Sequence, residues 1–171
     1  TFKLPIYEYY RVMGASENVM PKLQEEFRRA YPKYGNRIRI FPEVKSVLRK
    51  LEKEKISLAI VSNIPSLFLL EHLRRFGIGK FFNSVTGQED CEEQKPSPKP
   101  ILVTLEKISL KPEHSAYVGD MEEDIMAGKR AGVYTFAINR ANSYHQSWRL
   151  RRHNPDFLIS DLNELLTIVK M

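Results

Sequence analysis

Three short segments carry side chains that suit the binding of phosphate and of metal ions. Ser62 and Asn63 offer a hydroxyl and an amide, and Lys95 offers an ammonium group. Asp120 and Asp124 offer two carboxylates four residues apart. Hydroxyl, amide and ammonium groups donate hydrogen bonds to anions, whereas carboxylate oxygens are ligands that suit Mg²⁺. These residue types indicate a site that binds a phosphate group beside a divalent metal ion.

The elements that must position these side chains follow a regular order. Short apolar or β-branched runs alternate with helical patterns from residue 41 onward, which predicts right-handed crossovers and a parallel sheet. We therefore expect an α/β fold, a Rossmann-like parallel sheet flanked by helices. In such sheets ligands bind beyond the carboxyl ends of the strands, where the three segments fall. The predicted strands are 58–61, 84–86, 115–118, 133–138 and 157–159.

Each segment also has a purely structural interpretation. The Ser62-Asn63 pair precedes a helix, so it is also an ordinary N-cap, although the free backbone N–H groups there would favour an anion. Asp120 can likewise act as a helix cap. Lys95 lies between Gln94 and Pro96, and the proline-rich loop favours a fixed position for its ammonium group. The alternative is that Lys95 is an ordinary solvated lysine. Lys99 is the other candidate for the cation of this loop.

The N-terminal part of the chain has a different composition and a different hydrophobic pattern. From Ile6 to Tyr31 the sequence is aromatic and predicts two amphipathic helices separated at Gly14. We expect residues 1–40 to form a partial helical cap and residues 41–171 to form the core domain.

The charge of the chain suits anionic partners. Its net charge is +6, and basic residues crowd the stretch from Arg140 to His153, where Tyr144 and Trp148 are possible base-stacking groups. A nucleic-acid-binding domain is thus an alternative from another functional class. We favour solvated basic faces, with Trp148 packed against the domain. The acidic pair 122–123 is expected to be exposed in the first turn of a helix.

The cysteine count and the length of the apolar runs limit the class of protein. The single cysteine, Cys91, excludes an intramolecular disulfide, and no apolar run reaches the roughly 18 residues of a membrane span. A soluble, cytoplasmic protein without membrane partners is expected.

The ordered set of motifs resembles motifs two, three and four of the haloacid dehalogenase superfamily, most closely the phosphatases related to phosphoglycolate phosphatase. The resemblance implies that Ser62 binds the transferring phosphoryl group, that Asn63 lines the same pocket and that Lys95 neutralises charge. It implies that Asp120 binds Mg²⁺ and that Asp124 belongs to the metal site as a ligand or as an orienting group. The implied reaction is Mg²⁺-dependent hydrolysis of a small phosphorylated substrate through an aspartyl-phosphate.

The nucleophile of the resembled family is an aspartate in an Asp-x-Asp-Gly-Thr motif, which this sequence does not contain. Residues 1–40 hold no aspartate at all. Three explanations are open: an N-terminal segment absent from this chain, a non-catalytic pseudo-phosphatase that binds phosphate and Mg²⁺, or a partner polypeptide that supplies the nucleophile strand. A homodimer is a further possibility, because a missing strand leaves apolar surface exposed.

Overall fold

The computed structural model describes residues 14, 16–35, 37–141 and 147–168, and the chain divides into two compact units, Thr1–Phe41 and Pro42–Met171. The first unit contains the 3₁₀ turn η1 (Glu17–Val19) and the helix α2 (Met20–Gly35). The rings of Phe27 and Tyr31, four residues apart on α2, have centroids separated by 5.3 Å. The first of the two helices expected here lies outside the described residues.

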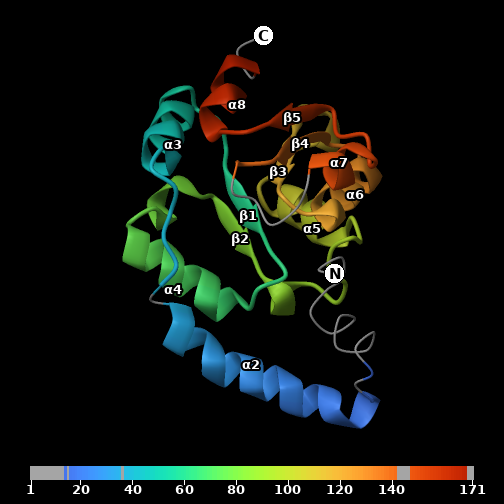
Figure 1. Cartoon of the computed structure of the whole chain (residues 1–171). Coiled ribbons are helices and arrows are strands. Elements are labelled where there is room, and N and C mark those ends of the chain that lie inside the picture. The colour runs from blue at the N-terminus through green and yellow to red at the C-terminus, as the bar shows by residue number, and fades with distance from the viewer. Residues whose placement is uncertain (1–13, 15, 36, 142–146, 169–171) are drawn as a thin grey trace. The chain divides into compact units, whose positions relative to one another are not determined.

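The second unit alternates helices and strands, which confirms the predicted α/β class (Figure 1). Helices α4 (Ser66–Phe76) and α6 (Glu122–Ala131) both end at a glycine in the left-handed conformation, Gly77 (φ 64°) and Gly132 (φ 75°), where a side chain would be strained. The elements are α3 (Val44–Lys53), β1 (Ala59–Val61), α4 (Ser66–Phe76), η2 (Gly79–Phe81), β2 (Ser84–Thr86), η3 (Gln88–Asp90), α5 (Lys99–Lys107), η4 (Pro112–His114), β3 (Ala116–Gly119), α6 (Glu122–Ala131), β4 (Tyr134–Ile138), α7 (Ser147–Arg151), β5 (Phe157–Ile159) and α8 (Leu162–Ile168).

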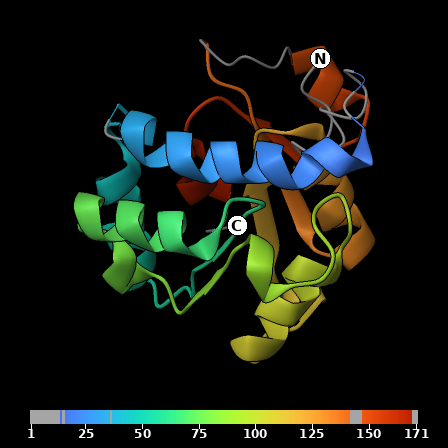
Figure 2. The same ribbon diagram turned by 90° about the horizontal axis from the view of Figure 1, so that it is seen from below.

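The strands are parallel, but they form two ladders where the sequence predicts one sheet. Among the described residues, strand β1 pairs only with β2, and β3, β4 and β5 form a separate three-stranded ladder in that order. The two ladders lie side by side in both views of the molecule (Figures 1 and 2). A hollow lined by both β1 and β3 separates them, so their facing edges do not pair.

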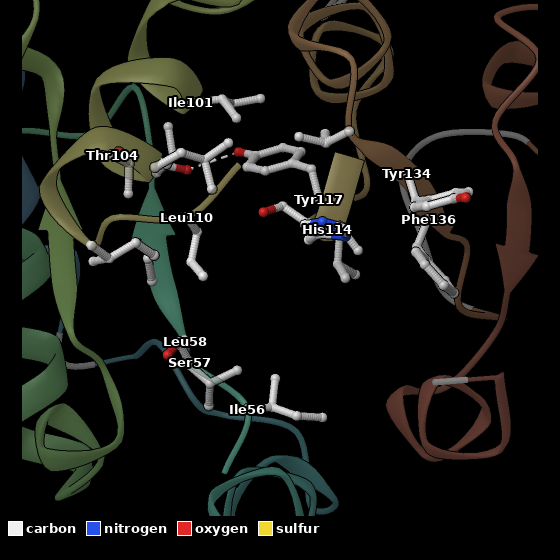
Figure 3. A pocket seen from close by; sticks show the side chains of 18 of the residues that line it. Ile56, Ser57, Leu58, Ile101, Thr104, Leu110, His114, Tyr117, Tyr134 and Phe136 are labelled. Atoms are coloured by element: carbon white, nitrogen blue, oxygen red, sulfur yellow. Dashed lines mark hydrogen bonds between the residues drawn. The ribbon is translucent and has the colours of Figure 1, made fainter. Parts of the chain in front are cut away.

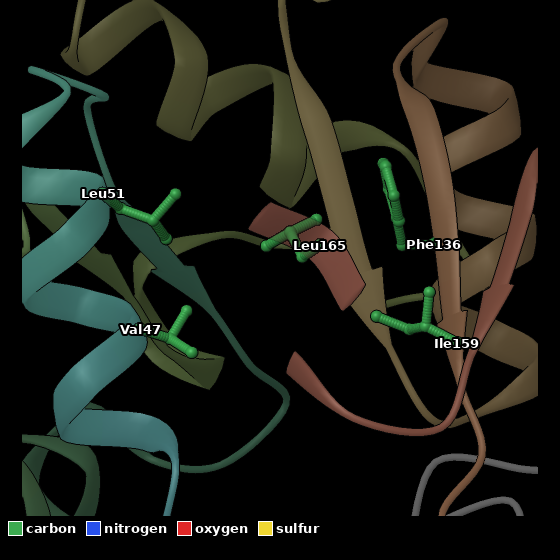
Figure 4. Close-up of a cluster of buried hydrophobic side chains, with 5 residues drawn as sticks. All are labelled: Val47, Leu51, Phe136, Ile159 and Leu165. Carbon is green, nitrogen blue, oxygen red and sulfur yellow. The ribbon is translucent and has the colours of Figure 1, made fainter. Parts of the chain in front are cut away.

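Helices cover both faces of the three-stranded ladder. One cluster joins α3 and α8 to β4 and β5 through the side chains drawn in Figure 4, and Val118 packs against it. A second cluster joins α5 and α6, and Tyr117 packs against that one. Because successive side chains of a strand point to opposite faces, these neighbours on β3 place the two clusters on opposite sides of the ladder. Burial on both sides explains why the strands are apolar runs rather than alternating patterns.

None of the helices in the described ranges has the length and apolar character needed to cross a membrane.

Candidate functional site

The ammonium group of Lys95 lies at the centre of the candidate site. The residue is only 9% exposed, and its Nζ donates to Oδ1 of Asp124 at 2.6 Å and to the Tyr117 hydroxyl at 2.9 Å. A longer contact of 3.5 Å joins Nζ to the carbonyl oxygen of Val61 at the end of β1. The side chain from the loop after β2 therefore meets groups from β1, β3 and α6 at one point.

Asp124 holds this arrangement with both of its carboxylate oxygens. While Oδ1 accepts from Lys95, Oδ2 accepts from the backbone N–H groups of Asp120 (3.1 Å) and Met121 (3.0 Å). These two N–H groups belong to the turn that joins β3 to α6. The carboxylate therefore fixes the turn and anchors the ammonium group at the same time.

The turn requires glycine at position 119 because of the close approach of Asp124. A Cβ atom added to Gly119 would lie against Cβ, Cγ and Oδ2 of Asp124, each closer than the 3.0 Å that real Cβ atoms respect. The backbone at the end of β3 can thus pass the carboxylate only without a side chain. The Gly-Asp dipeptide is a steric condition for the Lys95–Asp124 pair.

The loop that carries Lys95 is held by the segment after β1. The Asn63 side-chain amide donates to the Lys95 carbonyl (3.1 Å) and accepts from the Lys95 N–H (3.2 Å). Asn63 thus positions the lysine backbone, a role that the sequence analysis did not assign to it. Ser62 remains beside it, with its hydroxyl accepting from the Ile64 N–H at 3.2 Å.

The electrostatics of the cluster favour a charged lysine and a neutral tyrosine. Burial by itself would lower the pKa of Lys95, but the nearby Asp124 carboxylate and the Tyr117 hydroxyl outweigh it, so the net pKa lies above the ordinary value. Burial raises the pKa of Tyr117 to about 12, despite the opposing attraction of Lys95. Lys95 therefore stays positively charged at neutral pH and is paired with the Asp124 carboxylate.

Asp120 differs from Asp124 because it is exposed at the end of β3. The residue follows β3 directly, whereas both carboxylate oxygens of Asp124 accept hydrogen bonds. Within the described residues, no group of three or more His, Cys, Asp or Glu side chains is gathered to hold a metal ion. The donor set nevertheless fits Mg²⁺, which keeps several waters and needs only one or two carboxylates when substrate oxygens complete its shell.

The start of α4 is not the open anion site that its N–H groups suggested. The Ser66 N–H donates to the Glu89 carboxylate at 2.8 Å, and the Ser66 hydroxyl donates to Asp90 at 2.5 Å. The acidic run after β2 folds back onto the helix terminus, because carboxylates are favourable partners for those N–H groups. The Ser66 N–H and hydroxyl are therefore already occupied by carboxylates of this chain.

The expectation of exposed acids at the start of α6 is wrong. Glu122 and Glu123 are 4% and 5% exposed. Glu122 contacts Arg152 at 3.0 Å and His153 at 2.9 Å, so it holds the segment around α7 against α6. Burial raises the pKa of Glu123 to about 7, and the nearby carboxylates of Asp124 and Glu122 act in the same direction.

The basic stretch is partly neutralised by these and other acids. Arg140 lies 2.5 Å from the Glu43 carboxylate, and Arg149 and Arg152 both approach Glu122. Trp148 is 53% exposed, with the Arg149 guanidinium 5.6 Å from its ring, so the expectation that it packs against the domain is wrong. Its α7 is a short helix that buries Leu150 instead. Tyr144 lies outside the described residues.

Sequence reasoning missed Tyr117 as a member of the cluster. Its hydroxyl donates to the Val61 carbonyl at 2.9 Å and accepts from Lys95, which joins the two ladders. A tyrosine in the middle of a buried strand is the signal that could have found it, because a buried phenol needs a hydrogen-bond partner.

Comparisons with known families and with known proteins point to the same family of hydrolases. The family described as haloacid dehalogenase-like hydrolase matches residues 1–138. The pyrophosphatase PpaX of Oceanobacillus iheyensis is 35% identical over 80% of this chain and 63% of its own length. A phosphoglycolate phosphatase of Vibrio parahaemolyticus is 34% identical over 90% of this chain and 67% of its own length. The chain thus spans about two thirds of the length of these relatives.

Solved structures show the same fold. A predicted phosphoglycolate phosphatase from Haemophilus somnus superposes with a TM-score of 0.79 at 28% identity, over 91% of this chain and 68% of the other. A haloacid dehalogenase-like hydrolase from Bacteroides fragilis superposes with a TM-score of 0.83 at 23% identity, over 89% of this chain and 72% of the other. The second likeness supports the fold alone.

Proposed function

Because the chain belongs to the haloacid dehalogenase-like hydrolases, we propose that it carries the phosphate-binding and metal-binding groups of an enzyme that hydrolyses a small phosphate monoester. The names of the similar proteins suggest phosphoglycolate, a phosphate monoester, as the first substrate to test and pyrophosphate, a phosphoanhydride, as the second. A cytoplasmic location is part of the same proposal.

The observation that carries this proposal is the buried Lys95–Asp124 pair beside Ser62 and Asp120. Lys95 would neutralise charge on the phosphoryl oxygens, and the Ser62 hydroxyl would donate a hydrogen bond to one of them. Asn63 would keep Lys95 in place through its two backbone hydrogen bonds. Positioning and charge neutralisation supply most of the rate enhancement in phosphoryl transfer, so these groups suit that reaction.

Asp120 would hold the Mg²⁺ ion, and Asp124 would orient the Asp120 turn rather than bind the metal, because both of its oxygens are engaged. When bound, Mg²⁺ would neutralise charge on the phosphoryl oxygens beside the lysine. The proposed aspartyl-phosphate would form on an aspartate other than Asp120 and Asp124, which have the roles given above.

Binding of inorganic phosphate tests the proposal without requiring the nucleophile. We expect phosphate to raise the melting temperature of the chain in the presence of Mg²⁺ and to raise it much less in EDTA. Asp120→Asn should abolish the Mg²⁺-dependent part, and Lys95→Met should abolish the phosphate effect. Lys99→Met is the matched control, because Lys99 is exposed and pairs only with surface acids.

Two results would contradict the proposal: a phosphate effect that Asp120→Asn and Lys95→Met leave intact, or one that Lys99→Met removes equally. Turnover separates the two forms of the site. Release of phosphate from phosphoglycolate or pyrophosphate identifies an enzyme, whereas Mg²⁺-dependent binding without release fits a pseudo-phosphatase and also fits a nucleophile that a longer chain or a partner supplies.

A further inference from the structure

Helix α7 (Ser147–Arg151) is held on the second unit through one buried side chain. Leu150 is fully buried, and it packs with Ile125 of α6 and Ala137 of β4. The helix contacts α6, beside which it lies in Figure 1. Because Leu150 takes the inward side of this short helix, the side chains on its other side face solvent.

The outward side of α7 presents the single tryptophan of the chain among arginines. Trp148 is 53% exposed, and Arg151 and Arg152 are exposed as well. The Arg152 N–H donates to the Trp148 carbonyl at 3.2 Å, so the helical turn continues to Arg152. Residues three and four positions apart are neighbours on a helix surface, so both arginines lie next to the indole ring. The Arg149 guanidinium lies 5.6 Å from the ring. We call these four residues the α7 platform.

The positive charge of the α7 platform exceeds the negative charge that faces it. Glu122 of α6 lies 3.0 Å from Arg152 and 3.9 Å from Arg149, and it also contacts His153 at 2.9 Å. One carboxylate therefore serves two arginines and a histidine. Arg151 forms no ion pair with an acid in the part of the chain that the structure describes. The platform thus has the charge to attract an anion.

The side chains of the α7 platform suit an anion that also carries an aromatic ring. A guanidinium group is planar and donates two parallel hydrogen bonds to phosphate oxygens, which a lysine ammonium group does not do. An exposed indole ring provides a face on which a nucleic-acid base stacks. Phosphates and a base occur together in a nucleotide. The platform therefore offers a partner to each of the two parts of that ligand.

We propose that the α7 platform binds a free nucleoside di- or triphosphate, with the base stacked on Trp148 and the phosphate groups bound by Arg151 and Arg152. One ring and three guanidinium groups on a helix of five residues match a single nucleotide. Proteins that bind single strands stack successive bases on several aromatic side chains, which this helix does not offer. An acidic peptide would pair with the arginines but would leave the indole ring without a partner.

The proposed nucleotide site does not use the groups of the candidate phosphatase site. Lys95 pairs with Asp124, whereas the platform contacts α6 at Glu122. Binding of the nucleotide therefore needs neither Lys95 nor Mg²⁺, and it is independent of the proposed phosphatase activity. The two sites are nevertheless connected through the first turn of α6, because Glu122 follows Asp120 by two residues.

Tryptophan fluorescence tests the proposal directly, because all of it comes from Trp148. The 171-residue chain is titrated with ATP in EDTA at low ionic strength, with excitation where the base does not absorb. We expect ATP to quench the emission, and inorganic triphosphate, which has the phosphates but no base, to quench it little. Calorimetry should show that ATP binds about ten-fold more tightly than inorganic triphosphate. Equal affinities for the two ligands would overturn the proposal and would identify a surface for polyanions in general.

Arg151→Gln removes the cation of the platform that has no acid as a partner. The affinity for ATP should fall about ten-fold, because hydrogen bonds between charged groups are among the strong ones. Arg74→Gln is the matched control, since Arg74 is an exposed arginine in the last turn of α4 and its loss changes the net charge equally. The control should leave the affinity unchanged. Equal losses in the two variants would mean that ATP responds only to net charge, which would overturn the proposal.

Trp148→Leu tests the stacking of the base and is measured by calorimetry, because the fluorescent group is lost. The affinity for ATP should fall to that for inorganic triphosphate. Tyr134→Leu is the matched control: Tyr134 is an exposed aromatic residue of β4, at the border of the hollow drawn in Figure 3. This control should keep the preference for ATP. A Trp148→Leu variant that still prefers ATP would overturn the proposed stack.

Lys95→Met separates the platform from the candidate phosphatase site, to which the phosphates of ATP could also bind. A melting curve first confirms that the variant is folded at the temperature of the titration. ATP should still quench Trp148 in Lys95→Met, and adding Arg151→Gln should weaken this binding as it does in the unsubstituted chain. Loss of ATP binding in Lys95→Met alone would assign the nucleotide to the candidate site. That result would overturn the platform proposal and leave the phosphatase proposal intact.

Discussion

Substitution of Asp124 by asparagine should be among the most destabilising single changes in the core domain. The carboxylate is buried and accepts from Lys95 Nζ at 2.6 Å. Asparagine keeps the shape, but it places either its NH₂ group against the ammonium or its single oxygen away from the turn. Removing one partner of a buried ion pair costs about 3–5 kcal/mol, because the other charge stays buried without compensation. That loss is a large share of the 5–15 kcal/mol typical of a domain.

A double-mutant cycle separates the pair from the general effects of each substitution. Lys95→Met leaves the Asp124 carboxylate with two backbone N–H donors, so we expect a smaller loss of about 1–3 kcal/mol. The double variant carries neither charge and should lose about 2 kcal/mol less than the sum of the single variants. Lys99→Met, at an exposed lysine, should change stability by less than about 0.5 kcal/mol.

The assay is urea unfolding at pH 7 and again at pH 9.5. In Asp124→Asn only the Tyr117 hydroxyl still opposes the burial of Lys95, so we expect the folded pKa of Lys95 to fall below the unfolded value and the folded state to bind fewer protons. Stability must then rise with pH, and the variant should recover part of its loss at pH 9.5. A loss below about 1 kcal/mol at pH 7, or a coupling near zero in the cycle, would refute the reasoning.

Three further predictions concern positions around the cluster. Gly119→Ala should cost at least about 2 kcal/mol in urea unfolding, because its Cβ would overlap Asp124, whereas Gly79→Ala, with its nearest atom at 3.6 Å, should be close to neutral. The pKa of Glu123 is raised from 4.5 to about 7, so in EDTA the chain should lose stability as the pH rises from 4.5 to 7. Glu123→Gln should remove this loss, which is on the order of 2 kcal/mol. A variant whose stability depends on pH in the same way as that of the unsubstituted chain would contradict the prediction. Trp148 should show red-shifted, readily quenched fluorescence, and Trp148→Ala should change unfolding by less than about 0.5 kcal/mol; a blue-shifted emission would contradict its exposure.

The order of elements could be predicted from sequence because each carries a strong local signal. The helices that end at Gly77 and at Gly132 carry a cap that is recognisable in the sequence, since only glycine adopts the left-handed conformation without strain. The strands could be placed within a residue or two because short apolar runs stand between these helices. Their division into two ladders had no such signal, since pairing depends on which strands are neighbours in space.

The candidate site was predictable in its residue types but not in its contacts. Strand ends bring Ser62, Lys95 and Asp120 to one edge of the fold, which sequence order alone suggests. The use of Asn63 on the Lys95 backbone depends on the loop conformation, which no periodicity encodes. The burial of Glu123 was missed for a similar reason, because a charged residue in a first helical turn is ordinarily solvated.

The charged groups of the site come from two separate segments of the chain, so the site depends on the folding of both. The cation and the hydroxyl come from residues 62–95, whereas the carboxylates come from residues 120–124. A cut in the exposed turn at Lys111 would leave two fragments, one with the anion-binding groups and one with the acids. Neither fragment contains both the lysine and the carboxylates of the site. The site therefore forms when α3 packs on α8 and α5 packs on α6. Recovery of phosphate binding on mixing such fragments would therefore report their reassembly directly.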